Sequence, residues 1–232
     1  MRLKFLISQI VLSTLFAASS AQSAIQAMAS RVVYDGQYKA ASLALKNNAN
    51  KAYMVQTWLE SGLAVDPQTK IPFVVTPPLI KIESQQESTL RFIYAGEGLA
   101  KDRESQFWIN IQEIPPKPEK ENTLQLAVRS KIKLFYRPQS IDVTLADAIK
   151  QVKWSVKDNA LVLENNSPLF VTVGDLTLSG QSTPVKNLDQ DMAAPFSQLT
   201  VIKALPKNVT SIQYTYLNEY GANVSMPVVH LK

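Results

Sequence analysis

The residues best suited to enzymatic chemistry are scarce in this chain. Its 232 residues include one histidine and no cysteine. A Ser-His-Asp triad needs a histidine held by an aspartate beside a serine, whereas His230 lies in an apolar terminal segment. One histidine and no thiol also make a zinc site unexpected. We therefore expect no catalytic residue, no metal and no cofactor.

Two pairs of carboxylates remain as candidates for acid–base chemistry. They are Asp189 with Asp191, and Glu119 with Glu121. Such catalysis needs two carboxyl groups that face each other across a cleft, which neighbours in sequence do not establish. Both pairs lie in polar sequence, and we interpret them as solvated loop residues.

The chain begins like a secretory signal peptide. A positive start at residues 2–4 precedes a mostly apolar run over residues 5–18, and small residues follow. The apolar run is shorter than the ~20 residues that a membrane span requires. Residues 1–24 are therefore predicted to be a signal peptide, with the cut between residues 21 and 29. The mature protein is then expected to be exported.

Charge and cysteine content narrow the class of protein further. The formal net charge is +5, and removing the two charges of Arg2 and Lys4 leaves +3. No block of lysine and arginine with interleaved aromatics is present, so we expect no nucleic-acid partner. An exported chain without cysteine must be stabilised by packed cores, which domains of this size can supply.

The rest of the chain reads as short β-strands. Segments rich in Val, Ile, Leu, Tyr and Thr alternate with turn residues, and 13 prolines interrupt them. Only residues 146–152 could form one or two turns of helix. This pattern is typical of antiparallel β-sandwiches. Besides a first strand that begins at Arg31, the predicted strands are 42–46, 53–60, 90–94, 107–114, 123–136, 153–156, 161–164, 170–178, 198–203, 212–217 and 224–231.

A break at Pro138 divides the predicted strands into two sets. Proline cannot donate to a sheet ladder, so it is a natural exit from a strand. We predict an all-β protein with one sandwich domain at residues 25–138 and a second at residues 139–232.

The most informative segment is Thr123–Tyr136, because most strands run only about 3–10 residues. Leu124, Leu126 and Val128 alternate with less apolar residues, which is the period of a strand with one apolar face. Two interpretations stay open. The three side chains either join the core of their own sandwich, or line an exposed sheet edge that is offered to another chain.

Two lysines lie inside the same predicted strand. Lys131 and Lys133 would cost free energy if they were buried without a partner. Either they face solvent or they await an anion.

Several motifs occur in an order that resembles a known family. The chain is similar to the periplasmic pilus (fimbrial) chaperones of the PapD-like family over nearly its whole mature length. The motifs that carry the resemblance are Arg31-Val-Val-Tyr-Asp-Gly, Thr76-Pro77-Pro78, Arg91-Phe92, Asp102-Arg103-Glu104-Ser105, Phe107–Pro116, Lys131–Pro138 and Asn218-Glu219-Tyr220-Gly221.

The resemblance implies a fold and a function. Such proteins consist of two immunoglobulin-like domains in a boomerang arrangement, and they work in the periplasm without catalysis. They fold, cap and deliver pilus subunits by donor-strand complementation. The implied partners are pilus subunits (pilins) and an outer-membrane usher. Whether the free protein associates with itself to hide its exposed edge stays open.

The resemblance also assigns roles to residues of the first domain. Arg31 and Lys133 would bind the subunit's terminal carboxylate in the cleft between the domains. Leu124, Leu126 and Val128 would be the donor residues. Strict alternation puts Lys133 on the opposite face of the strand from the donors, and a bulge or a strong twist would reconcile the two roles.

A third set of residues concerns the junction of the domains. By resemblance, Glu104, Arg137 and Glu219 would form a buried charged trio between them. Glu219 stands where an aspartate is common in the family, so its reach differs by one methylene.

Two other classes of protein remain as rivals. A secreted hydrolase would need a convergent histidine or carboxylate site, which the sequence scarcely offers. A pilus subunit usually has a cysteine pair and a single incomplete domain.

Overall fold

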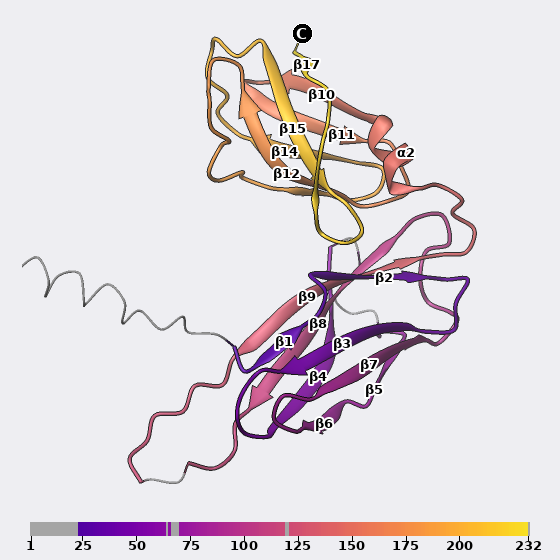
Figure 1. Ribbon diagram of the computed structural model, residues 1–232. Helices are drawn as coiled ribbons and strands as arrows, with labels where there is room; N and C mark the ends of the chain where they lie inside the picture. The colour runs from indigo at the N-terminus through magenta and orange to yellow at the C-terminus, as the bar shows by residue number, and fades with distance from the viewer. Residues whose placement is uncertain (1–22, 64, 66–69, 119–120, 232) are drawn as a thin grey trace, which may run out of the picture.

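The first half of the chain forms a β-sandwich. In the computed structural model, which describes residues 23–63, 65, 70–118 and 121–231, a 4-stranded sheet in the order β1-β3-β7-β5 packs on a 5-stranded sheet in the order β2-β9-β8-β4-β6 (Figure 1). The strands are β1 (Ile25–Ala27), β2 (Arg31–Asp35), β3 (Ala41–Asn47), β4 (Tyr53–Ser61), β5 (Phe73–Thr76), β6 (Leu79–Ile82), β7 (Glu87–Tyr94), β8 (Ser105–Ile114) and β9 (Arg129–Arg137).

Alternating side chains build the core of this first sandwich. In β7, Leu90 and Phe92 are buried while Arg91 between them is exposed. Period-2 alternation sends these two kinds of side chain to opposite faces of the sheet. Leu43 of β3 and Leu134 of β9 approach from the two sheets and join the same apolar cluster.

The second half forms another sandwich. A 3-stranded sheet (β10-β11-β14) faces a 5-stranded sheet in the order β13-β12-β15-β16, with β17 also paired to β15. Its core is a separate apolar cluster. The elements are α2 (Leu145–Lys150), β10 (Val152–Lys157), β11 (Ala160–Asn165), β12 (Val171–Leu178), β13 (Met192–Ala193), β14 (Ser197–Ile202), β15 (Ser211–Leu217), β16 (Asn223–Ser225) and β17 (Val229–His230).

The two-sandwich, almost entirely β architecture confirms the predicted fold class. The short helix is also real, because the Thr144 hydroxyl accepts a hydrogen bond from the Asp147 N–H at 3.2 Å and caps it. Two predicted strands are wrong in extent. The segment 224–231 is broken around Pro227 into β16 and β17, since proline cannot donate to the ladder. The segment 123–136 is regular only from Arg129 onward.

The two sandwiches meet at one side, where the chain passes from β9 to α2 (Figure 1). β9 ends at Arg137 and α2 begins at Leu145. The domain boundary at residue 138 stays a prediction that agrees with this placement. The predicted signal peptide lies outside the described residues, apart from its last two positions. Among the described residues, no helix has the length and apolarity needed to cross a membrane.

Candidate functional site

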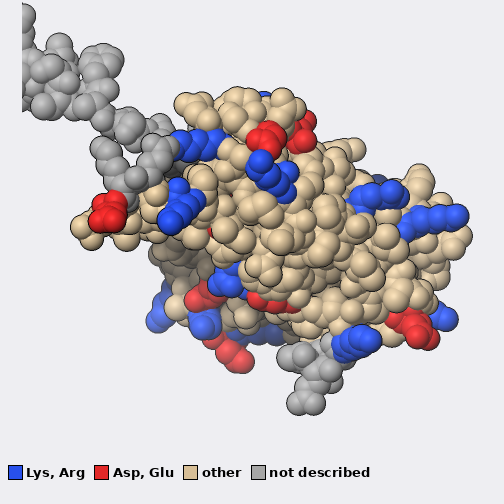
Figure 2. Space-filling model, turned by 90° about the horizontal axis from the view of Figure 1, so that it is seen from below, with Lys and Arg blue, Asp and Glu red and all other residues tan. Residues whose placement is uncertain are grey.

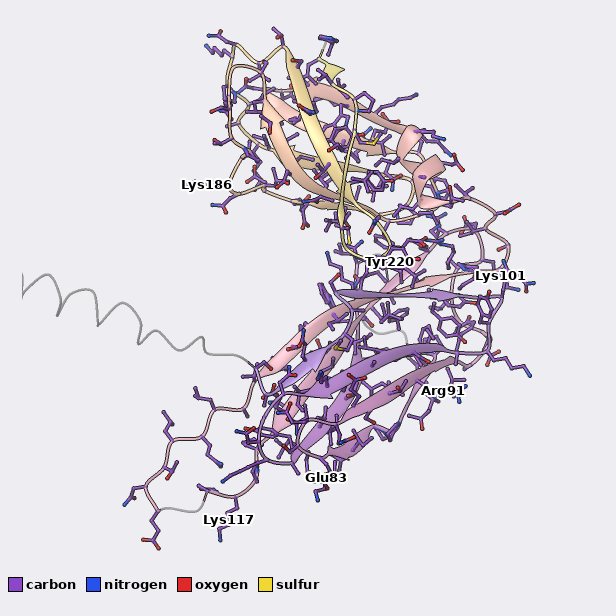
Figure 3. The ribbon with its side chains drawn as sticks, viewed as in Figure 1. Glu83, Arg91, Lys101, Lys117, Lys186 and Tyr220 are labelled. Atoms are coloured by element: carbon purple, nitrogen blue, oxygen red, sulfur yellow. The ribbon has the colours of Figure 1, made fainter. Side chains whose placement is uncertain are left out.

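The segment Thr123–Val128 leads into β9 and carries the three predicted donor residues. Their side chains are highly accessible: Leu124 is 86% exposed, Leu126 76% and Val128 41%. Figure 3 shows this segment leaving the body of the first sandwich, on the same excursion as Lys117. Hydrogen bonds keep it near β8 and the loop after β8. The Val128 carbonyl accepts from the Glu113 N–H at 2.9 Å and from the Gln112 side-chain amide at 3.2 Å, and the Gln125 amide donates to the Pro116 carbonyl at 2.7 Å. The interpretation of these residues as core of their own sandwich does not fit this exposure.

The β9 strand itself is paired unequally on its two sides. On one side β8 pairs with it from Arg129 to Tyr136. On the other side β2 runs parallel to it and pairs only from Lys133 onward, where Arg31 is the partner. Within the described residues, the edge of β9 from Arg129 to Ile132 therefore has no strand beside it. Such an edge is a template for an added strand.

The two predicted anchor cations lie at the point where that open edge ends. Arg31 and Lys133 are partners in the parallel register of β2 and β9. Both side chains are half-buried on the outer face of the sheet. The Arg31 guanidinium lies 5.8 Å from the ring centre of Phe135, and the Lys133 ammonium lies 5.8 Å from that of Trp108. The structure thus brings the predicted anchors together.

The surroundings of Lys131 and Lys133 show which of them faces solvent and which is available to an anion. Lys131 forms an ion pair with Glu60 at 2.7 Å in a solvent-exposed position. Burial lowers the pKa of Lys133, and nearby Asp191 partly offsets this effect. Burial likewise lowers the pKa of Arg31, whose Nε atom has no hydrogen-bond partner among the described residues. A pair of partly desolvated cations favours an incoming anion.

The question of a bulge in β9 is also decided by the register. The pairing of β8 with β9 runs without interruption from Ser105–Tyr136 to Gln112–Arg129. No bulge therefore reconciles Lys133 with the donor residues. Ile132 and Leu134 face the core, and Lys133 faces outward between them. The anchors and the core side chains simply occupy opposite faces.

An open pocket of about 590 Å³ lies beside Lys133, between the two sandwiches. The first sandwich contributes Leu63, Trp108 and Lys133, and the second contributes the segment from Asp189 to Ala194 and the start of β14. Lys133 therefore borders a cleft between the sandwiches, and its register partner Arg31 lies beside it, next to Phe135 and Phe170 at the junction.

The predicted charged trio is assembled at the junction of the sandwiches. Arg137 Nε lies 2.9 Å from Glu104 Oε1, and Arg137 Nη1 lies 2.7 Å from Glu219 Oε1. The other Glu104 oxygen accepts the backbone N–H of Phe170 at 2.8 Å. Burial raises the pKa of Glu104, and the two carboxylates raise the pKa of Arg137 in spite of its burial. The longer reach of Glu219 suffices for direct contact.

An apolar contact beside this trio was not predicted from the sequence. Phe135 of β9 packs on Phe170 and Met192 of the second sandwich, with the two rings 5.5 Å apart. Phe135 has the parity of outward-facing Lys133, so a large apolar residue at an outward position was the available signal.

The other candidate residues lie apart from the site described above. His230 is in β17. Among the described residues, no group of three or more His, Cys, Asp and Glu side chains could hold a metal ion. Asp189 and Asp191 are exposed loop residues, as is Glu121, while Glu119 lies outside the described residues.

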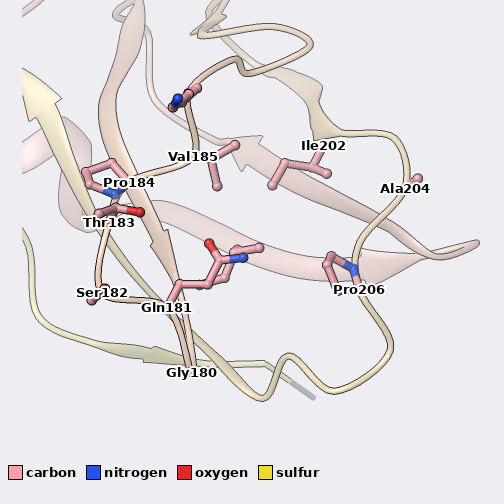
Figure 4. A pocket seen from close by; sticks show the side chains of 11 residues that line it. Gly180, Gln181, Ser182, Thr183, Pro184, Val185, Ile202, Ala204 and Pro206 are labelled. Carbon is pink, nitrogen blue, oxygen red and sulfur yellow. The ribbon is translucent and has the colours of Figure 1, made fainter.

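Charged side chains and a second pocket lie elsewhere on the surface of the described residues. On the face seen in Figure 2, basic and acidic side chains are scattered around a largely uncharged surface. A pocket of about 630 Å³ lies in the second sandwich beyond the end of β12 (Figure 4). Its lining is neutral apart from Lys186.

Two family models match this chain. "Pili and flagellar-assembly chaperone, PapD N-terminal domain" matches residues 24–142, and "Pili assembly chaperone PapD, C-terminal domain" matches residues 147–227. Among individual proteins, the chaperone protein HifB of Haemophilus influenzae is 34% identical over 215 residues, covering 89% of this chain and 88% of that protein. The chaperone protein FimC of Escherichia coli is 35% identical over 211 residues, covering 88% and 83%.

Solved structures resemble the whole two-sandwich chain. One is from the complex of the SafA pilin with the SafB chaperone of Salmonella enterica, with a TM-score of 0.79, 26% identity, and coverage of 92% of this chain and 99% of that one. Another is the E. coli chaperone DraB, with a TM-score of 0.76, 32% identity, and coverage of 89% and 98%.

Proposed function

The chain belongs to the PapD family of pili assembly chaperones, and we propose that it holds pilin subunits by donating a β-strand and binding their terminal carboxylate. It is a chaperone of pilus assembly. The related structure from the SafA–SafB complex, solved with a pilin, supports pilins as the class of client.

The exposed apolar segment Leu124–Val128 is the observation that carries this proposal. Three apolar side chains at every second position are offered to solvent on one segment. A subunit that lacks its final strand has the complementary defect, which is an open apolar groove. Burying one leucine contributes about 1.5–3 kcal/mol. Because the client is incomplete alone, this binding energy also stabilises its folded state.

The open edge of β9 explains how a carboxylate would reach the anchors. A client strand added beside Arg129–Ile132 would lie in line with β2, which occupies the same side from Lys133 onward. Such a strand has to end where Arg31 begins. A terminal carboxylate placed there meets both cations, and charge-assisted hydrogen bonds to a carboxylate are strong.

The charged trio has a supporting role in this proposal. Glu104, Arg137 and Glu219 join β8, β9 and the β15–β16 turn across the junction. They hold the angle between domains 25–138 and 139–232, and thereby the width of the cleft. Desolvated ion networks of this kind are costly to break by removing one member.

The remaining parts of the proposal concern setting and partners. Residues 1–24 act as a signal peptide and direct the chain to the periplasm. The protein works by binding and not by catalysis. An outer-membrane usher receives the chaperone–pilin complex, and in the absence of a pilin a second copy of this chain covers the exposed edge.

The donor strand is tested by co-expression of the full chain with pilins encoded nearby, followed by periplasmic pull-down and mass spectrometry. The wild-type chain should yield a 1:1 complex. Leu126→Glu should remove the complex while the chaperone stays folded, because the charge enters an apolar groove only in the client. Val156→Glu is the matched control, since Val156 is an exposed apolar strand residue of the second sandwich. Equal pilin recovery with Leu126→Glu and Val156→Glu would contradict the proposal.

The anchor is tested separately with the double variant Arg31→Ala/Lys133→Ala. Each charge-assisted bond contributes about 1.5–3 kcal/mol, so Lys133→Ala alone should weaken pilin binding by roughly tenfold to a hundredfold. Lys131→Ala is the control, because Lys131 lies on the same strand and face but is paired with Glu60. Wild-type affinity in the double variant would rule the anchor out. Sedimentation of the free chain tests the self-associated state.

A further inference from the structure

The residue before Glu104 makes a second contact across the junction, and the charged trio does not include it. The Arg103 guanidinium lies 5.1 Å from the ring centre of Phe196 in the second sandwich. Next to it, the Glu104 N–H donates to the Pro168 carbonyl at 2.9 Å. The short loop before β8 therefore contacts the second sandwich through backbone, carboxylate and guanidinium together.

The Arg103 side chain is held in a defined orientation. Asp102 accepts from Arg103 Nε at 3.0 Å and from Nη2 at 2.7 Å, a two-point contact. Such a fork fixes the plane of a guanidinium as well as its position. The guanidinium can then present its face to the ring, which is the arrangement that a cation–π contact requires.

Phe196 is an unusual residue for the place it occupies. Its φ angle is 52°, in the left-handed region that favours glycine, and its N–H donates to the Ser167 carbonyl at 3.2 Å. Its ring is 49% exposed. An aromatic residue there bears backbone strain, which persists only where the surroundings compensate for it. The contact of the ring with Arg103 helps to compensate for this strain, beside the hydrogen bonds of the turn to Ser167 and Ala194.

The turn that carries Phe196 is part of the wall of the cleft. Ala194 and Ser197, on either side of it, line the pocket beside Lys133. Ala194 also packs against the apolar cluster of Phe135, Phe170 and Met192. A contact at the tip of this turn therefore controls how far the second sandwich's wall stands from the anchor.

We propose that Arg103 and Phe196 are a positioning pair that fixes the cleft wall opposite Lys133 and so sets the geometry in which the client's carboxylate is bound. This inference rests on the proposed function, because the pair matters for binding only if the cleft binds the client's carboxylate. The pair involves different side chains from the trio, because Arg103 contacts Phe196 whereas Glu104 contacts Arg137.

The sharpest variant is Phe196→Gly, because glycine accepts the left-handed backbone without strain while the whole side chain, ring included, is removed. The absence of cysteine lets two be introduced for labels, at exposed Glu97 in the first sandwich and Lys207 in the second. In the full chain, Phe196→Gly should broaden the distance distribution between the labels while thermal stability is kept. Phe196→Tyr, which keeps the ring, should restore the wild-type distribution.

The functional readout is binding of a peptide that copies a pilin's last strand, with a free or an amidated terminus. Phe196→Gly should weaken binding of the free-carboxylate peptide roughly two- to fivefold, the scale of one exposed cation–π contact, and leave the amidated peptide unchanged. Arg103→Ala added to Phe196→Gly should cause no further loss. A wild-type distance distribution and wild-type affinity in Phe196→Gly would overturn the positioning pair.

The same experiment separates the inference from its premise. If the wild-type chain binds both peptides equally, the carboxylate anchor fails, and the positioning pair loses its function with it. If the wild-type chain prefers the free carboxylate and Phe196→Gly keeps that preference in full, only the positioning pair fails.

Discussion

Two halves of one apolar segment behave in opposite ways in this molecule. From Leu124 to Val128 and from Ile132 to Tyr136, large apolar side chains recur at every second residue. In the second half Leu134 is 0% exposed, whereas in the first half Leu126 is 76% exposed. The alternating pattern therefore predicts that one face of the segment is buried, but it does not predict whether that face packs against the same chain or another one.

The difference comes from what each half finds beside it. Ile132 and Leu134 have β8 on one side and a sandwich core beneath them. The first half runs past the end of the sandwich, where Val128 and Gln125 form hydrogen bonds to the strand and loop opposite. We propose that the missing neighbours come from the client.

The largest expected effect separates the two halves by folding alone. Leu134→Glu places a charge in a closed core and should prevent the first sandwich from folding. Leu126→Glu should leave the free energy of unfolding within about 0.5 kcal/mol of wild type, because its side chain is in solvent. Urea unfolding followed by circular dichroism measures both. If Leu126→Glu unfolded the chain as well, the two halves would be equivalent.

The end of the buried half should be nearly as sensitive. Arg137→Ala leaves Glu104 buried without its cation, at a cost of about 3 kcal/mol, the low end for buried pairs because Glu219 is partly exposed. We expect a lower thermal midpoint and reduced periplasmic abundance. Arg129→Ala, at the exposed start of the same strand, is the control. An unchanged midpoint in Arg137→Ala would show that the trio does not hold the junction.

Within the exposed half, the effect should appear only with a client present. Leu126→Ala removes most of the burial that one leucine would gain, about 1.5–3 kcal/mol, so pilin affinity should fall by roughly tenfold to a hundredfold. Leu126→Ile should be nearly silent, because volume and polarity are kept. Titration with a refolded pilin measures both, and similar losses in the two variants would argue against a shaped groove.

The smallest effect is a pH dependence at Lys133, which lies near the start of the buried half. Burial lowers the pKa of Lys133. Lys133 therefore loses its positive charge at a lower pH than an ordinary lysine, whose pKa is about 10.4. Binding of the free-carboxylate peptide should weaken as pH rises toward that value, and Lys133→Arg should remove the decline. The folded state binds this proton less tightly than the unfolded chain does. The free energy of unfolding should therefore increase as pH rises through the same window. A pH-independent affinity would exclude Lys133 from the anchor.

Much of the architecture was predictable from local pattern. Strands such as β4 and β8 lie close to their predicted bounds because turns and prolines delimit them. The grouping of Arg31 with Lys133, and of Arg137 with two glutamates, came from resemblance, since residues so far apart in the chain have no local signal of contact. The contact of Arg103 with Phe196 was not predicted, because a left-handed phenylalanine leaves no mark on periodicity.

The sequence by itself determined that the chain lacks cysteine, has one histidine and forms mainly β-strands, and it predicted a signal peptide. It also determined that one long segment has an alternating apolar face, which is stable only when buried. Only the tertiary structure decided where that segment stops being a strand. Pairing between β2, β9 and β8 is long-range. The regular strand β9 begins at Arg129, so the same alternating pattern is core from Ile132 onward and exposed surface from Leu124 to Val128. Local sequence sets which side chains share a face, while the presence of a neighbouring strand depends on contacts far along the chain.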